Sequence, residues 1–156
     1  MMLHGKHEPV NGERASARRR AISWVLVALW AAVIFYMSSR TGDSLSNGFF
    51  GIVKQWAEGL LNKAFGYHED PLSPICHFIE YLVLGVLLCN ALDSDRLLRW
   101  VVACAVVIAS AYGVTDEIHQ ILVPGRFCDP LDWLTDTVGA FLGSLLWLLR
   151  RKTRRH

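Results

Sequence analysis

Seven acidic and histidine side chains lie within or beside apolar segments that are long enough to cross a membrane. They are His77, Glu80, Asp116, Glu117, His119, Asp132 and Asp136. A charged side chain at membrane depth costs about 3 kcal/mol or more unless it is paired or hydrated, so such residues indicate function by default. These seven are therefore the candidate catalytic residues.

Helical spacing places most of them on shared faces. His77, Glu80 and Tyr81 follow the i, i+3, i+4 pattern of one helix face. The next apolar segment repeats that pattern with Asp116, His119 and Gln120. A third face contains Asp129, Asp132, Asp136, Gly139 and Gly143. Acids near its start suit the helix dipole, and two glycines four residues apart allow close contact with another helix.

Two chemistries fit these side chains. Histidines and carboxylates can ligate a divalent metal that polarises an oxygen or activates water. Alternatively, His77 or His119 with Glu80 or Glu117 can serve as general acid and base. Residues 116–119 do not form an HExxH motif, and no GxSxG motif occurs, so the motif evidence for a metal is weak.

Glu80 and His77 are expected to share a proton. They lie three residues apart on one face, and the following helix brings His119 to the same depth. Such a pair would poise a proton near neutral pH and would suit acid–base work. The alternative is a protonated Glu80 that is hydrogen-bonded to a backbone carbonyl.

Five further residues are candidates for substrate binding: Arg126, Arg40, Ser38, Gln120 and Tyr81. A guanidinium at the Pro124-Gly125-Arg126 turn could bind a phosphate through two hydrogen bonds. The same charge could instead neutralise a neighbouring acid. A single polar residue such as Tyr81 or Gln120 more often simply holds helices together.

The composition predicts an all-α integral membrane protein. Residues 21–37, 75–92, 97–114 and 131–149 are apolar on nearly every face. Each range spans roughly 26–28 Å as a helix, close to the thickness of a hydrocarbon core of about 30 Å. In a soluble chain of 156 residues, four such helices could not all be buried. We therefore expect a four-helix membrane bundle.

The distribution of charge predicts the orientation of these helices. Twelve of the 16 basic residues fall before the first segment, in or beside the turn between the second and third, or after the fourth. Positive charge collects on the cytoplasmic side, so both termini are expected there. Residues 1–20 and 150–156 form basic cytoplasmic tails, the first of them disordered, and residues 21–149 form the membrane domain.

The first outer loop is expected to contain an amphipathic helix. Between residues 49 and 65, apolar residues recur at helical spacing, with polar residues on the other face. Such a helix could lie on the outer membrane surface or pack over the bundle. Of the four cysteines, Cys76 and Cys128 both fall on the outer side, where a disulfide is permitted.

These motifs resemble those of the VanZ-like membrane proteins. His77-Phe78-Ile79-Glu80-Tyr81, followed by Leu84-Gly85, is similar to the first motif of that family. The family's second motif is similar to two stretches of this sequence. They are Asp116-Glu117-Ile118-His119-Gln120 with Pro124-Gly125-Arg126, and the spaced residues Asp132, Asp136, Gly139 and Gly143. The resemblance covers residues 22–149. Position 136 is Asp where many relatives have Asn, and a lysine often seen before the histidine of the first motif is missing.

The resemblance implies a bacterial inner-membrane protein of the cell envelope, in a family whose namesake is associated with resistance to teicoplanin. We expect an outer-leaflet polar pocket that binds or modifies a lipid-linked or phosphate-bearing envelope component. Membrane lipids, and a lipid-linked cell-wall precursor, are the expected partners, and nucleic acid is not. A divalent metal is the one candidate cofactor. The alternative function is that of a non-enzymatic structural or assembly factor of the membrane.

Overall fold

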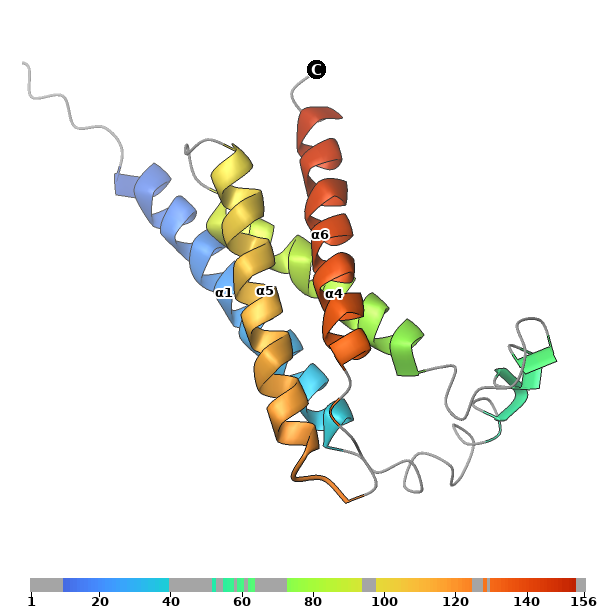
Figure 1. Cartoon of the computed structure of the whole chain (residues 1–156). Coiled ribbons are helices and arrows are strands. Elements are labelled where there is room, and N and C mark those ends of the chain that lie inside the picture. Colours follow the sequence, from blue (N-terminus) through green and yellow to red (C-terminus); the bar gives the residue numbers. More distant parts are fainter. Residues whose placement is uncertain are drawn as a thin grey trace, which may run out of the picture.

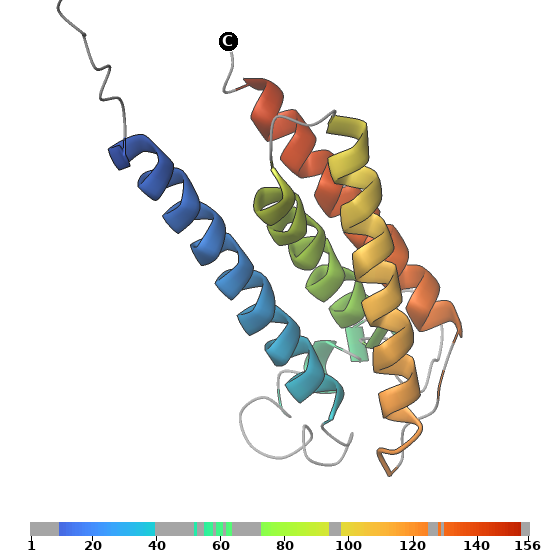
Figure 2. The same cartoon turned by 90° about the vertical axis from the view of Figure 1, so that its left-hand side faces the viewer.

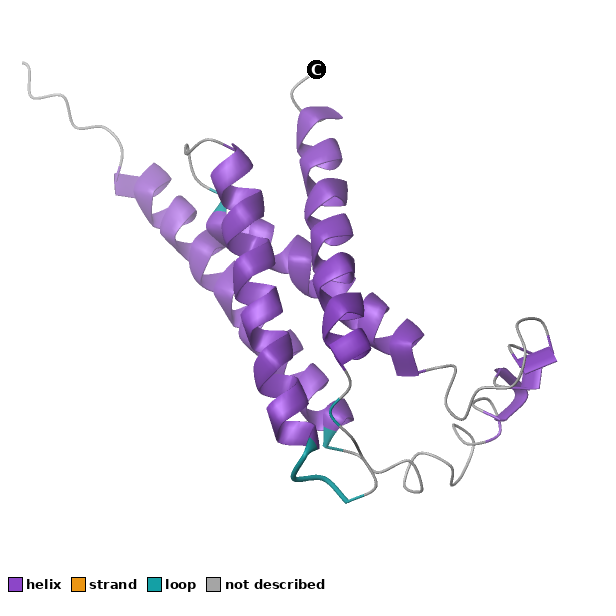
Figure 3. Ribbon diagram, in the orientation of Figure 1, coloured by secondary structure: helices purple, strands orange, loops and turns teal. Residues whose placement is uncertain are grey.

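Four long helices pack side by side in the computed structural model, which describes residues 10–39, 52, 55–57, 59–60, 62–63, 73–93, 98–124, 128 and 130–153 (Figure 1). They are α1 (Val10–Ser38), α4 (Ser73–Leu92), α5 (Leu98–Gln120) and α6 (Pro130–Thr153). The described residues contain no strand (Figure 3). The prediction of an all-α protein is therefore confirmed.

Three helices of the described chain are long and apolar enough to cross a membrane. They are the stretch Ser16–Ser38 of α1, with 23 residues, then α4 with 20 residues and α5 with 23 residues. Each exceeds about 17 residues, the shortest helix that spans a bilayer. Helix α6 is not among them, since it contains Asp132 and Asp136 near its start and a basic cluster at its end. These helices identify the chain as a membrane protein.

The first helix begins earlier than the sequence pattern predicts. It starts at Val10, so the expectation that all of residues 1–20 are disordered is wrong for residues 10–20. The added turns contain alanine, glutamate and arginine, which have high helix propensity and extend an apolar helix at little cost. Helix α4 begins with Ser73-Pro74, where proline fits the first turn because its missing N–H would have no partner within the helix.

Helix α4 contacts each of the other three long helices, and its contact with α6 is the most extensive. Glycines allow this close approach. A Cβ atom added at Gly139 would lie 2.5 Å from the carbonyl oxygen of Phe78. Cβ atoms at Gly143 and Gly85 would likewise collide with the backbones of Leu82 and Ala140. The two helices therefore touch backbone to backbone, as the paired glycines predict.

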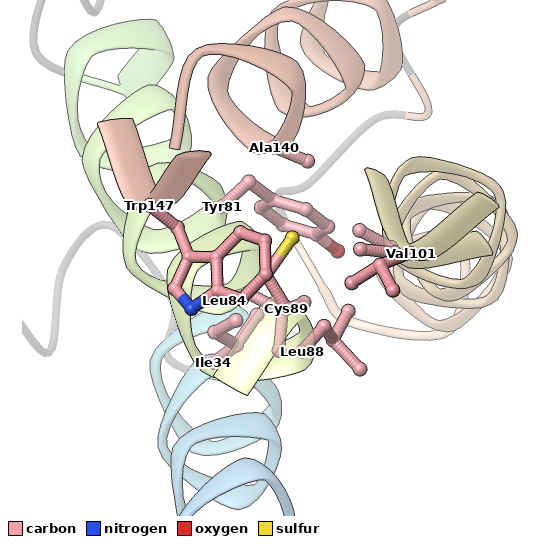
Figure 4. Close-up of a cluster of buried hydrophobic side chains, with 10 residues drawn as sticks. Ile34, Tyr81, Leu84, Leu88, Cys89, Val101, Ala140 and Trp147 are labelled. Carbon is pink, nitrogen blue, oxygen red and sulfur yellow. The ribbon is translucent and has the colours of Figure 1, made fainter. Parts of the chain in front are cut away.

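The buried centre of the molecule combines side chains from all four helices (Figure 4). Ile34 of α1, Tyr81 and Leu88 of α4, and Trp147 of α6 belong to it, with small α5 residues such as Ala105 closing one side. Many large apolar side chains elsewhere on the helices are exposed. An apolar outer surface around a packed centre is expected of helices that face lipid.

Hydrogen bonds between helices fix their positions along one another. The Trp30 indole of α1 donates to the backbone oxygen of Glu80 on α4, at 2.9 Å. The Tyr112 hydroxyl of α5 donates to the backbone oxygen of Ala31 on α1, at 2.7 Å. The Trp147 indole of α6 donates to the side-chain oxygen of Asn90 on α4, at 2.9 Å. Each bond joins a different pair of helices.

The two ends of the helix group differ in charge. The start of α1, the end of α4, the start of α5 and the end of α6 lie at one end in both views (Figures 1 and 2). The described basic residues there include Arg18, Arg99 and Lys152. The opposite end, called the acidic end below, joins the end of α1, the start of α4, the end of α5 and the start of α6. It carries the described candidate residues.

Between α1 and α4, the described residues at positions 52, 55–57, 59–60 and 62–63 are helical. Their apolar side chains Ile52, Trp56 and Leu60 are exposed. In Figure 1 this segment stands to the side of the four long helices. Its apolar face is therefore not covered by them, as a helix packed over the group would require.

Candidate functional site

A buried histidine–carboxylate pair joins α4 to α6 at the acidic end. The Nδ1 atom of His77 lies 3.1 Å from Oδ1 of Asp136. His77 is 4% exposed and Asp136 is wholly buried. The two residues come from segments 59 positions apart, and the glycine contacts between α4 and α6 bring their backbones close enough for the pair to form. An ion pair or a shared hydrogen bond is how a membrane helix accommodates an acid.

Helix α5 closes the other side of Asp136. A Cβ atom added at Gly113 would lie 3.1 Å from Oδ2 of Asp136 and 3.4 Å from the Trp133 ring. Glycine at position 113 thus makes room for the carboxylate between three helices. Asp132, one turn before Asp136, is close enough to interact electrostatically with both members of the His77–Asp136 pair.

Asp116 adds a second buried carboxylate to this region. Its Oδ2 atom accepts a hydrogen bond from the Gln120 side-chain amide at 3.3 Å, one turn along α5. Both residues are buried. Asp116 also interacts electrostatically with Asp136, and Glu80 does so with His77. His77, Glu80, Asp116, Asp132 and Asp136 therefore form one acidic cluster, with Gln120 bound to its α5 member.

His119 occupies a different place, between the ends of α1 and α5. Its Nε2 atom lies 3.0 Å from the Ser39 hydroxyl, and its ring lies 4.3 Å from that of Phe35. The Ser39 hydroxyl also lies 2.6 Å from the backbone oxygen of Phe35, to which it donates its only proton. His119 Nε2–H must then donate to Ser39, so this arrangement does not activate the serine as a nucleophile.

Each long helix contributes at least one buried side-chain oxygen that has no hydrogen-bond partner among the described residues, and four of them matter here. These are Oγ of Ser38 on α1, the Tyr81 hydroxyl on α4, Oδ1 of Asp116 on α5 and Oδ2 of Asp136 on α6. Tyr81 is wholly buried, and its ring extends toward α5 (Figure 4). Tyr81 interacts electrostatically with both Asp116 and Asp136. A buried oxygen of this kind commonly marks a place for a water molecule, an ion or a ligand.

The structure brings together most of the residues singled out from the sequence. Glu117 is also buried on α5, next to Asp116. Arg40 and Arg126, the candidate anion-binding residues, lie outside the described residues.

In the ranges that are described, no group of three or more His, Cys, Asp or Glu side chains is arranged to hold a metal ion. Cys76 and Cys128 are exposed and are not joined by a disulfide.

Two features of the site differ from what the sequence suggested. The carboxylate that contacts His77 is Asp136 of α6, although helical spacing had pointed to Glu80. His119 contacts Ser39, which was not among the candidate site residues. Gly113 was not singled out at all. Its position one turn before Asp116, in a segment of larger residues, was the available signal.

The buried pair can orient an imidazole for proton transfer. With Nδ1 held by Asp136, the other ring nitrogen of His77 is the one that can exchange a proton with a ligand. Asp136 then stabilises the protonated ring, as a carboxylate does in a catalytic histidine pair. The same geometry, left unreacted, is a strong link between α4 and α6.

Comparison with known proteins places the chain in a family. A family model described as VanZ/LLP1 matches residues 23–151. Searches of curated proteins and of solved structures give no significant match. The matched range includes the whole of α4, α5 and the described acidic cluster. The chain therefore belongs to the VanZ-like family.

Proposed function

We propose that this chain is a bacterial envelope protein that binds or modifies a lipid-linked or phosphate-bearing component at its acidic end. The His77–Asp136 pair is the observation that carries this proposal. A wholly buried acid in a membrane helix is costly, and a purely apolar contact would hold the same two helices at lower cost. The position of this pair beside Asp116 and Asp132 supports a role for it beyond holding the two helices together.

In this proposal all four long helices cross the cytoplasmic membrane, with both termini in the cytoplasm. Helix α6 has less apolar character than the others, but its Asp136 is paired inside the helix group and does not face lipid. The helical segment with exposed Ile52, Trp56 and Leu60 would then lie on the outer membrane surface. Labelling of a cysteine introduced at Gly59 should occur only from the outside. Labelling from the cytoplasmic side alone would refute this topology.

In this proposal the arginines and His77 have separate roles. Arg126 follows α5 and Arg40 follows α1 in the chain, so the sequence puts both next to the acidic end. Their guanidinium groups would hold the anionic part of the ligand. His77, oriented by Asp136, would exchange a proton if the ligand is modified. Binding without chemistry needs only the first of these two roles.

Substitution at the buried pair tests the proposal. A strain lacking the protein would be complemented with wild type, His77→Asn or Ser144→Ala, and both teicoplanin susceptibility and the amount of folded protein in the membrane would be measured. Ser144 is a matched control, because it is buried in α6 two turns beyond Asp136 and bonds to Ala140 and Cys89, not to the His77–Asp136 pair. We expect His77→Asn to lose function at normal abundance. Full function of His77→Asn, or equal loss in Ser144→Ala, would contradict the proposal.

A second candidate function is that of a non-enzymatic structural or assembly factor. It is favoured by the side chains of Trp30, Tyr112 and Trp147, each of which bonds to a neighbouring helix. In that case the polar residues serve to fix helix positions. Variants at His77 or Asp136 would then lower function only in proportion to the loss of folded protein.

A further inference from the structure

The buried oxygens of Tyr81, Asp116 and Asp136, called the oxygen cluster below, come from three helices that pack together, and Tyr81 interacts electrostatically with both acids. Asp136 lies between His77 of α4 and Gly113 of α5. Tyr81 is one turn from His77, and Asp116 is one turn from Gly113, so both flank that carboxylate. One such oxygen thus comes from each of α4, α5 and α6.

The chemistry of the oxygen cluster selects its ligand. Two of the three oxygens belong to carboxylates and can only accept a hydrogen bond when ionised, and the Tyr81 hydroxyl can also accept. The surrounding described acids, Glu80, Glu117 and Asp132, add negative charge, which His77 offsets only in part. A group that fits must therefore donate several hydrogen bonds and carry positive charge.

We propose that the oxygen cluster binds a primary ammonium group. An ammonium has three N–H donors in a compact cation, which matches several acceptor oxygens around a region of negative charge. Water would supply hydrogen bonds but no charge. A quaternary ammonium would supply charge but no N–H donor, and it is also bulkier. A phosphate would be repelled by the acids of this cluster.

The position of the cluster favours a phospholipid headgroup as the source. Asp116 lies four residues before the end of α5 and Asp136 lies six residues after the start of α6, whereas Tyr81 lies nearer the middle of α4. The two carboxylates are thus roughly 6–9 Å from a helix end. A phospholipid with an ethanolamine headgroup would put its phosphate beside the ammonium, outside the oxygen cluster. This inference rests on the proposed function and names its ligand class.

Pairs of ligands that differ in their N–H donors test whether the oxygen cluster binds a primary ammonium group. Full-length protein would be unfolded thermally in nanodiscs of phosphatidylcholine alone, or of phosphatidylcholine mixed with phosphatidylethanolamine. In detergent, ethanolamine would be compared with choline, and sodium chloride with choline chloride. We expect a higher Tm with phosphatidylethanolamine, and binding of ethanolamine about tenfold or more tighter than that of choline, because choline forfeits charged hydrogen bonds. A response to ethanolamine without one to the lipid would identify a free amine as the source.

Variants of the cluster residues test whether the preference for ethanolamine arises at the oxygen cluster. Asp116→Asn and Tyr81→Phe should each weaken the preference for ethanolamine by about tenfold, whereas Ser144→Ala should keep it. The two variants lie on different helices, so if one of them folds poorly, the other still tests the inference. Equal effects of ethanolamine and choline, or stabilisation by sodium over choline alone, would overturn the inference. If His77→Asn loses function while no ammonium preference exists, the proposed function stands and this inference fails.

Discussion

Substituting alanine for Gly139 should pull α4 and α6 apart. The added Cβ would lie 2.5 Å from the Phe78 carbonyl oxygen and 3.3 Å from the Leu82 amide nitrogen. Both are backbone atoms inside a helix, so no side-chain rotation can relieve the contact. The helices must separate by roughly 0.7–0.9 Å to restore an ordinary contact distance of about 3.2–3.4 Å. Gly143→Ala should act in the same way on Leu82.

The cost follows from the contacts that separation loses. Overpacking costs typically about 1–3 kcal/mol. Because relief here requires movement of a whole helix in the most extensive contact of the structure, we expect about 2–3 kcal/mol for Gly139→Ala. That change lowers the ratio of folded to unfolded protein by roughly 30- to 150-fold. Separation would also lengthen the His77–Asp136 contact, which is 3.1 Å in the native structure.

Equilibrium unfolding in detergent or bicelles measures this effect, with Gly59→Ala as the control. Gly59 lies in a described helical segment, and a Cβ added there meets no atom within 4 Å. We expect Gly59→Ala to change the free energy of unfolding by less than about 0.5 kcal/mol. If Gly139→Ala and Gly59→Ala have the same stability, the close contact between α4 and α6 is refuted.

Three other perturbations have distinct expected outcomes. His77→Leu alone should destabilise the protein by about 3–5 kcal/mol by leaving Asp136 buried without its partner, and the double variant with Asp136→Leu should recover most of that loss in the same unfolding assay. Additive losses would argue against the pair. Trp147→Phe should cost about 0.6–1.7 kcal/mol in unfolding free energy, through one lost hydrogen bond to α4, and a larger loss would indicate a packing role instead. Ser39→Ala should speed modification of His119 by diethyl pyrocarbonate, because Nε2 loses its partner, and an unchanged rate would contradict the hydrogen bond.

The acidic cluster could be predicted only in part. The residues themselves, and the fact that several helices bring them to one end, followed from helical spacing and the asymmetry of basic residues. The partner of His77 did not, because Glu80 is near it in the chain whereas Asp136 reaches it only through the contact of α4 with α6. Ser39 and Ser38 differ by one position on α1, so only the rotation of that helix relative to α5 decides which of them contacts His119.

The sequence by itself determined the membrane class, the family and the set of candidate residues, because hydropathy, charge asymmetry and motif spacing are local properties of the chain. It also predicted the glycine contact of α6, since glycines at helical spacing form one face. The tertiary structure alone decided where α1 begins, which carboxylate meets His77, and which oxygens remain buried without partners in the described chain. These depend on how each helix is rotated and shifted against its neighbours. Interhelical packing sets those values, and the periodicity of one segment does not contain them.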